Sequence, residues 1–262
     1  MGSRMEIRNL GYAYEGKKVV DDINLNVKKG EFVGIIGPNG SGKSTILKNA
    51  YRSLKPDNGV AMLDGTDIQG ISYKKLATKL GVVGQENSVP FDFKVEDIVA
   101  MGRSPHKKLF EGDSKKDKAI VASALKKTGM GEMAEKNYLH LSGGEKQRVI
   151  IARVLAQETD FLILDEPTNH LDIHYQLSIF DLVKGLGITV LSAIHDLNIA
   201  ALYCDRIYIL KDGRLVASGK PEELFTRDLI KEVYNIDADI MINPITGKAN
   251  ITYLPQSLRV CH

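Results

Sequence analysis

The sequence predicts an α/β fold: a mostly parallel sheet covered by helices, an N-terminal antiparallel β-subdomain and an inserted α-helical subdomain. Three observations support this fold class. The first 30 residues alternate apolar and polar side chains, which is typical of antiparallel strands. Strand and helix patterns then alternate, which indicates a parallel sheet with helices on both faces. Strand patterns are lost between about residues 86 and 158, where helical patterns follow one another.

The individual elements follow from apolar periodicity and from turn residues between the runs. The predicted strands are residues 5–8, 19–27, 32–36, 60–63, 81–83, 161–164, 188–192, 207–210 and 216–219. The predicted helices are residues 44–52, 72–79, 95–101, 114–128, 143–157, 173–184, 197–203, 221–225 and 229–234.

A single domain over residues 5–255 accounts for these elements. We expect residues 1–4 to be a leader added in cloning, with Met5 as the native start. Within the domain we expect a core, a helical subdomain and a C-terminal extension. These are residues 5–85 with 159–220, residues 86–158, and residues 221–255.

Composition excludes several classes of protein. The 262 residues include 35 basic and 33 acidic side chains, and a net charge of +2 argues against a nucleic-acid partner. The sequence contains no run of 18 consecutive apolar residues, so no membrane-spanning helix is expected. With 2 cysteines and no CxxC pair, neither a disulfide scaffold nor a structural zinc site is expected.

A glycine-rich segment between a predicted strand and a predicted helix matches the pattern GxxxxGK[ST]. Its glycines let backbone N–H groups turn toward phosphate oxygens, and the helix that follows directs its positive end to the same place. The lysine supplies charge to the β- and γ-phosphates, and the serine hydroxyl suits Mg²⁺. The expected nucleotide-binding residues are Gly37, Pro38, Asn39, Gly40, Ser41, Gly42, Lys43, Ser44 and Thr45.

Two acidic residues follow the apolar run at residues 161–164. A buried strand of a parallel sheet delivers such side chains to the edge where ligands bind. Asp165 is expected to hold Mg²⁺, together with Ser44, and Glu166 to polarise the attacking water as a general base. The same pattern would also arise from a strand that ends in a solvated acidic turn.

Residues 141–148, LSGGEKQR, resemble the signature motif of ABC ATPases, which are P-loop NTPases with a RecA-like core. The resemblance covers nearly all of residues 5–255. It implies ATP as substrate and a head-to-tail dimer, in which each signature caps the ATP held by the other copy. Glu145 stands where glutamine is commoner in the family. The residues implied to touch ATP are Leu141, Ser142, Gly143, Gly144 and Glu145.

Four further positions match the family in order and spacing. Tyr14 stands where an aromatic ring stacks on adenine, and Asp172 ends the loop that crosses the dimer interface. Gln85 resembles the loop glutamine that touches Mg²⁺ and water, and His195 resembles the switch histidine that contacts the γ-phosphate. The resemblance thus implies Glu166, His195 and Gln85 as catalytic residues.

Segments near Arg103, near His174 and after His195 resemble importers of iron–siderophore, haem and cobalamin. The implied partners are polytopic permease subunits and, indirectly, a substrate-binding protein, at the cytoplasmic face of the membrane. Molybdate and tungstate importers share much of this pattern. An exporter with separate subunits and a non-transport ABC ATPase of the ribosome or DNA-repair type are also compatible with the ATPase motifs.

Overall fold

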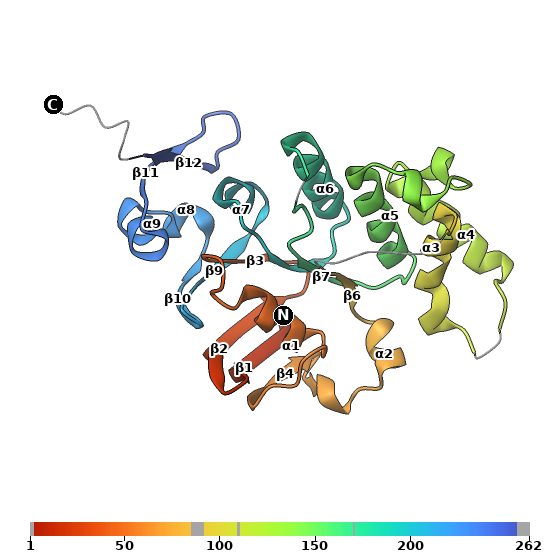
Figure 1. Cartoon of the computed structure of the whole chain (residues 1–262), viewed down its shortest axis with the longest axis horizontal. Coiled ribbons are helices and arrows are strands. Elements are labelled where there is room, and N and C mark those ends of the chain that lie inside the picture. The colour runs from red at the N-terminus through yellow and green to blue at the C-terminus, as the bar shows by residue number, and fades with distance from the viewer. Residues whose placement is uncertain (1–2, 85–91, 109–110, 170, 256–262) are drawn as a thin grey trace. The chain divides into compact units, whose positions relative to one another are not determined.

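The computed structural model describes residues 3–84, 92–108, 111–169 and 171–255 (Figure 1). The chain divides into two compact units. Unit 1 joins the chain up to Ile68 with the chain from Thr189 onward, and unit 2 is Gln69–Ile188.

Unit 1 contains an antiparallel sheet with the strand order β2-β1-β4-β5. Its apolar side chains alternate along β2, where Val20, Ile23, Leu25 and Val27 are buried. This alternation is the pattern that the first 30 residues predict. The strands are β1 (Ser3–Tyr14), β2 (Lys17–Lys28), β4 (Asn58–Leu63) and β5 (Thr66–Asp67).

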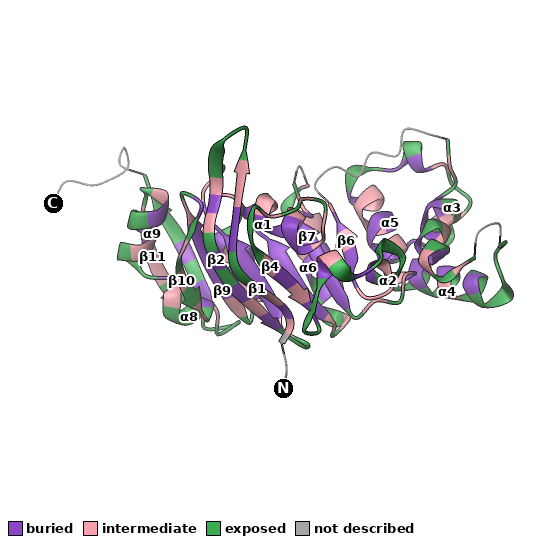
Figure 2. Ribbon diagram, turned by 90° about the horizontal axis from the view of Figure 1, so that it is seen from below, coloured by how far each residue is buried: buried purple, intermediate pink, exposed green. Residues whose placement is uncertain are grey.

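The second sheet of unit 1 is mainly parallel. Strand β3 pairs in parallel with β8 on one side and β9 on the other, and β10 pairs antiparallel with β9. Every residue of β3 and β8 is buried, which explains their continuous apolar runs. Buried residues are purple in Figure 2. The strands are β3 (Phe32–Ile36), β8 (Thr189–Ala193), β9 (Arg206–Lys211) and β10 (Arg214–Gly219).

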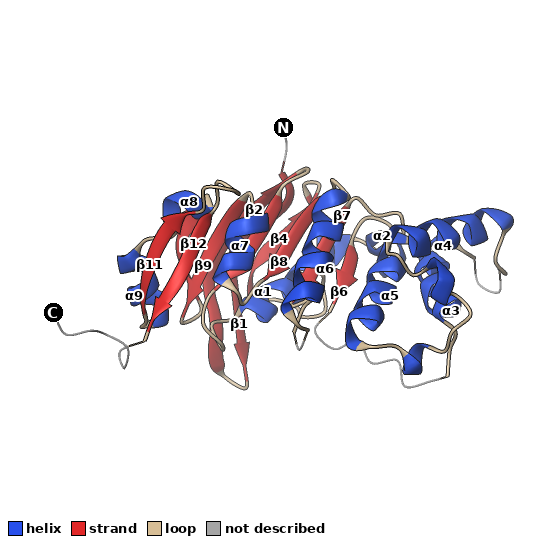
Figure 3. Ribbon diagram, turned by 90° about the horizontal axis from the view of Figure 1, so that it is seen from above, coloured by secondary structure: helices blue, strands red, loops and turns tan. Residues whose placement is uncertain are grey.

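Helices and a hairpin complete unit 1 (Figure 3). The last part of the chain adds two antiparallel strands, paired from Asp237↔Leu254 to Ile242↔Ala249, which the sequence interpretation did not predict. The elements are α1 (Lys43–Ala50), α7 (Leu197–Tyr203), α8 (Pro221–Leu224), α9 (Arg227–Tyr234), β11 (Asp237–Ile242) and β12 (Ala249–Leu254).

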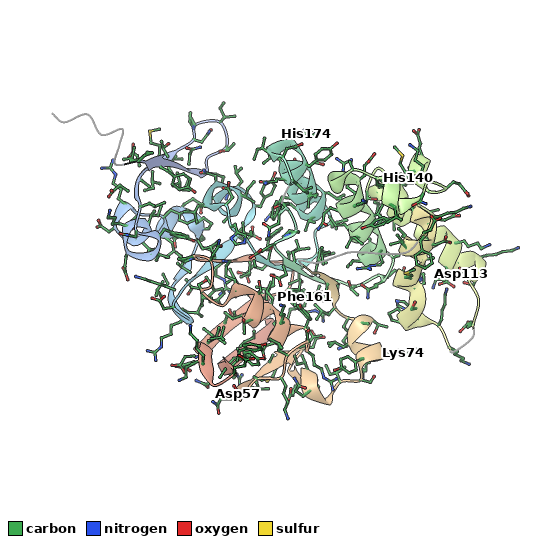
Figure 4. All side chains as sticks on the ribbon, in the orientation of Figure 1. Asp57, Lys74, Asp113, His140, Phe161 and His174 are labelled. Carbon is green, nitrogen blue, oxygen red and sulfur yellow. The ribbon has the colours of Figure 1, made fainter. Side chains whose placement is uncertain are left out.

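Unit 2 combines a pair of parallel strands with a group of helices. Phe161, labelled in Figure 4, is fully buried at the start of β7. The elements are α2 (Tyr73–Ala77), β6 (Gly81–Val83), α3 (Val95–Ala100), α4 (Lys115–Lys127), α5 (Gly143–Leu155), β7 (Phe161–Asp165) and α6 (Ile173–Gly185). Short 3₁₀ helices are η1 (Ile68–Gly70), η2 (Met101–His106), η3 (Gly131–Met133) and η4 (Tyr138–His140).

Arg103 is the polar centre of the helical part of unit 2. Its side chain donates from Nε to Asp117 at 2.9 Å and from Nη1 to the carbonyl of Ala156 at 2.6 Å. The Ser114 hydroxyl and the Arg103 guanidinium hold the pKa of Asp117 well below its usual range. Because Arg103 is 3% exposed, its charge is used inside unit 2 rather than offered to a partner.

The predicted fold class is therefore confirmed: a parallel core, an N-terminal antiparallel sheet and helices between β6 and β7. Within the described residues, no helix has the length and apolar character that a bilayer span requires.

Gly102 allows η2 to approach α5 closely. A Cβ at this position would lie 2.0 Å from the carbonyl oxygen of Arg153. We expect Gly102→Ala to lower the free energy of unfolding by about 1–3 kcal/mol, because backbone must move to admit the methyl group. Urea unfolding followed by circular dichroism measures the change.

Gly112 provides the matched control, since a Cβ there meets no atom within 4 Å. Gly112→Ala should leave the free energy of unfolding within about 0.5 kcal/mol of the parent chain. Equal effects of the two substitutions would contradict the close packing of η2 on α5.

Candidate functional site

The loop between β3 and α1 is shaped by glycines in conformations that other residues adopt rarely. Gly37, Gly40 and Gly42 have φ values of 153°, 77° and 103°. A Cβ on Gly37 would lie 2.1 Å from the carbonyl oxygen of Leu210, so β9 sets the floor of the loop. A Cβ on Gly42 would lie 2.5 Å from Val20 of β2. The loop is therefore built against two sheets. Gly37 and Gly42 are required by space as well as by φ, whereas Gly40 is required by φ alone.

Lys43 crosses this loop. It is 4% exposed, and its Nζ donates to the carbonyl oxygens of Gly37 at 2.9 Å and Pro38 at 3.1 Å. The ammonium group is thereby held at the mouth of the loop. Ser41 Oγ is buried and, among the described residues, meets no hydrogen-bond partner. Buried polar atoms of this kind are ordinarily satisfied, which suits a loop that closes around a polar ligand.

Helix α1 starts without a side-chain cap. Its N-cap, Gly42, has left-handed backbone and offers no side-chain acceptor, and its first turn contains no acidic residue. The first N–H groups of a helix have no partners within the helix. An anion is the natural ligand of such groups, because the helix dipole also favours negative charge there.

Tyr14 ends β1. Its side chain is 62% exposed, and it pairs with Lys17 next to the turn of the β1–β2 hairpin. The same hairpin contacts the loop through Val20, which lies against Gly42. An exposed ring held on a rigid hairpin is suited to stacking on a flat apolar ligand.

His195 follows β8 in unit 1. The preceding residue, Ile194, donates its backbone N–H to Ile35 at 3.0 Å, which extends the pairing of β8 with β3. His195 is exposed, and Asp196 directly after it accepts from the N–H groups of Asn198 at 2.7 Å and Ile199 at 3.1 Å. His195 is thus held between a sheet and a helix cap.

The two predicted carboxylates lie in unit 2 at the end of β7. Asp165 is its last residue and is 1% exposed. Glu166 has a positive φ of 53°, which is uncommon for a residue other than glycine. Its Oε2 accepts from Asn169 Nδ2 at 2.6 Å. Sequence reasoning placed Asn169 in the loop that resembles the one crossing the dimer interface, but it did not predict a contact with Glu166. The hydrogen bond of Asn169 fixes one side of the Glu166 carboxylate.

The segment LSGGE forms the start of α5. Ser142 is the N-cap and accepts from the N–H of Glu145 at 3.4 Å. The Glu145 carboxylate in turn accepts from the N–H of Ser142 at 2.8 Å and from its hydroxyl at 2.7 Å. These hydrogen bonds lower the pKa of Glu145. An acid at this position is thus favourable for the helix start, but it also places a negative charge where an anion would bind.

Helices α5 and α6 meet closely next to that capping box. A Cβ on Gly144 would lie 2.4 Å from the ring of Tyr175, and the Arg148 guanidinium lies 5.8 Å from the centre of the same ring. Asp172 caps α6 by accepting from the N–H of Tyr175 at 3.1 Å. Unit 2 therefore brings together Gly144 and Asp172, two predicted interface positions far apart in sequence. The sequence alone offered no sign of Tyr175 as the link.

The predicted Mg²⁺ donors are oxygen atoms of hydroxyl, carboxylate and amide groups. Ser44 follows Lys43 in α1, and Asp165 is a buried carboxylate at a strand end. Hard oxygen donors of these kinds fit Mg²⁺. Gln85 lies outside the described residues. Among the described residues there is no group of three or more His, Cys, Asp or Glu side chains able to hold a metal by themselves.

Comparisons with known proteins agree with this geometry. A family model described as ABC transporter matches residues 20–169. The iron(3+)-hydroxamate import ATP-binding protein of Bacillus subtilis is 40% identical over 248 residues, which cover 93% of this chain and 92% of that protein. The cobalamin import ATP-binding protein of Halobacterium salinarum is 36% identical over 255 residues, which cover 96% of this chain. The chain spans 64% of the length of that relative.

A solved structure is similar over the whole chain. It is an ABC transporter, described as of the metal-chelate type, in an inward-facing conformation. The TM-score is 0.86 at 25% identity, and the match covers 99% of this chain and 100% of that chain. Taken with the family model, which matches more than half of the residues, these similarities show that the chain belongs to the ABC transporter family.

Proposed function

We propose that this chain is the ATP-hydrolysing subunit of an importer that takes up a metal chelate of the iron–siderophore, haem or cobalamin type. The observation that carries the proposal is the presence of two different helix starts in one chain. One is the uncapped start of α1 behind a phosphate loop, and the other is the glycine-rich start of α5. Two separate anion sites suit an ATP that is held between two copies of the chain.

The phosphates bind first to unit 1. The N–H groups of the loop and of α1 hold the β- and γ-phosphates, and Lys43 turns its ammonium group from the carbonyls of Gly37 and Pro38 to the phosphate oxygens. Tyr14 stacks on the adenine ring. Mg²⁺, when bound, neutralises charge on the phosphates. The residues that would hold it are Ser44, Asp165 and Gln85.

Hydrolysis then depends on orienting water. Glu166 accepts a proton from the attacking water at its carboxylate, while Asn169 holds the other side of that carboxylate by the 2.6 Å hydrogen bond. His195 contacts the γ-phosphate and keeps the water in line with the bond that breaks. Glu166, His195 and Gln85 are the proposed catalytic residues.

The second copy completes the site. Residues Leu141 to Glu145 of one chain cap the γ-phosphate held by the other chain. Asp172 lies in the loop that crosses the interface between the two chains. The contact of Gly144 with Tyr175 delivers the start of α5 and the start of α6 to the partner together. ATP binding therefore draws two chains into a head-to-tail dimer, and hydrolysis releases them.

The remaining partners are polytopic permease subunits at the cytoplasmic face of the membrane and, through them, a substrate-binding protein. The similarity to ATP-binding proteins of iron-hydroxamate and cobalamin import supports this cargo class. Crosslinking the chain to its permease and binding protein in native membranes, and identifying the chelate that the binding protein retains, tests the assignment. Retention of molybdate or tungstate, or recovery of the chain with ribosomes, would contradict it.

Removing the proposed base separates binding from hydrolysis. We expect Glu166→Gln to lower the turnover number at least about 100-fold, because an amide does not accept the proton, while ATP still binds. The variant should accumulate with ATP as a dimer in sedimentation velocity. Turnover close to that of the parent chain would contradict the role of Glu166.

Two inactive variants test the shared site. Ser142→Arg fills the start of α5, and Lys43→Ala removes the phosphate-loop charge, so neither chain alone should hydrolyse ATP. A mixed dimer keeps one complete site, and random pairing predicts recovery of about a quarter of parental activity in an equal mixture. Full activity of Ser142→Arg alone, or no recovery on mixing, would rule out a site shared by two chains.

The negative charge of Glu145 is expected to lower the affinity of the site for ATP. Glu145→Gln keeps an acceptor for Ser142 but removes the negative charge, so the KM for ATP should fall about two- to five-fold. Glu132→Gln removes the same charge from an exposed position of unit 2 and serves as the control. Steady-state hydrolysis measures both, and equal KM values for the two variants would contradict the expected competition.

A further inference from the structure

The end of the chain has no part in the proposed chemistry. It comprises α9 and the β11–β12 hairpin, residues 227–254, here called the C-terminal segment. The turn of the hairpin is organised by Asn243, whose N–H donates to the carbonyl of Lys248 at 2.8 Å. Its side chain also accepts from the N–H of Ile245 at 2.9 Å. A hairpin of two strands is only marginally stable in water by itself, so contacts with the rest of unit 1 must hold it.

Asn198, in the first turn of α7, makes a polar contact between the hairpin and the rest of unit 1. Its Nδ2 donates to the carbonyl of Ile251 at 3.2 Å, and its Oδ1 accepts from the N–H of Ile251 at 2.7 Å. One side-chain amide thus satisfies both backbone groups of a residue in β12, as a neighbouring strand would do. The Ile251 side chain is 3% exposed, which places this pair beside buried apolar surface.

Asn198 is also tied to the loop that carries His195. Its backbone N–H donates to Asp196 at 2.7 Å, so one residue joins the cap of α7 to the hairpin. On the other side of His195, the N–H of Ile194 is fixed to β3. His195 is therefore an exposed side chain between two anchors, and the C-terminal segment supplies one of them.

Two tyrosines belong to the C-terminal segment. Tyr253 is 46% exposed, and partial burial with the charge of Asp196 raises the pKa of its hydroxyl. The Tyr234 hydroxyl is buried and, among the described residues, meets no hydrogen-bond partner. Strand β12 packs on α7, so the segment lies against the helix that follows His195.

We propose that the C-terminal segment positions His195 for hydrolysis, and that Asn198 is the positioning residue through which it acts. The proposal rests on the role given to His195 under the proposed function. It predicts a specific defect when the hydrogen bonds between Asn198 and Ile251 are lost. Phosphate binding by Lys43 and α1 is then unchanged, but His195 is no longer held at one position. Misplacement of an orienting group by about 1 Å can cost up to about 100-fold in rate.

The test uses the full chain with Asn198→Ala. Asn250→Ala is the matched control, because Asn250 is an exposed residue of the same strand and Ile251 is its neighbour. We expect Asn198→Ala to lower kcat about ten-fold while the KM for ATP changes less than about two-fold. Amide hydrogen exchange of residues 195–199 should become faster in Asn198→Ala and stay unchanged in Asn250→Ala.

Tyr253→Phe is a second variant that keeps the ring and removes only the hydroxyl, so folding is not in question. It should lower kcat with unchanged KM, by a smaller factor than Asn198→Ala. Parental kcat in Asn198→Ala would overturn the proposal. So would a fall in kcat that is matched by an equal loss of ATP binding, because that pattern indicates a general structural role.

His195→Ala, measured alongside, distinguishes the positioning role from the proposed function. If His195→Ala loses turnover and Asn198→Ala does not, the positioning role is wrong and the proposed function stands. If His195→Ala keeps parental turnover, the proposed catalytic role of His195 is wrong, and the positioning role is overturned with it.

Discussion

Helix α1 begins without a side-chain cap, and the proposed nucleotide site depends on that condition, because the N–H groups of the helix start can then meet an anion. Capping by a side chain would stabilise the helix by about 1 kcal/mol, but it would occupy the same groups. Gly42 offers no such side chain, and the contacts of Gly37 with β9 and of Gly42 with β2 keep the loop in shape. The loop between β3 and α1 is thus stabilised by its contacts with the two sheets rather than by a cap at the start of the helix.

Helix α5 differs from α1 in this respect. In its capping box, Ser142 accepts from the N–H of Glu145, and the Glu145 carboxylate accepts from the N–H of Ser142. Under the proposed function, an incoming phosphate competes with the Glu145 carboxylate for these donors. The proposal thus gives the two helix starts different roles: α1 binds ATP in a single chain, whereas α5 exchanges an internal partner for one on a second chain. In this proposal, ATP binds to unit 1 first and the partner chain binds afterwards.

Local patterns predicted much of the fold and most of the candidate site. The buried strands β3 and β7 were evident from their apolar runs, which in β7 are followed by the predicted carboxylate of Asp165. Contacts between distant segments could not be predicted in this way. The ring of Tyr175 against Gly144 and the burial of Arg103 depend on how helices pack.

The β11–β12 hairpin was missed for a related reason. Its two short strands lie in a polar tail, and the residue that completes its edge, Asn198, belongs to a helix about fifty positions earlier in the sequence. A two-stranded hairpin leaves a weak pattern because only a few of its side chains, such as Ala238 and Ile251, are buried.

The central claim is that each ATP is hydrolysed between two chains. The most direct measurement is the ATP turnover per chain of the unmodified protein over a wide dilution series, at saturating MgATP. A shared site predicts that turnover per chain falls as the protein is diluted, because the active species is the dimer. Turnover per chain that stays constant at every dilution, with the protein monomeric throughout by sedimentation, would contradict the account.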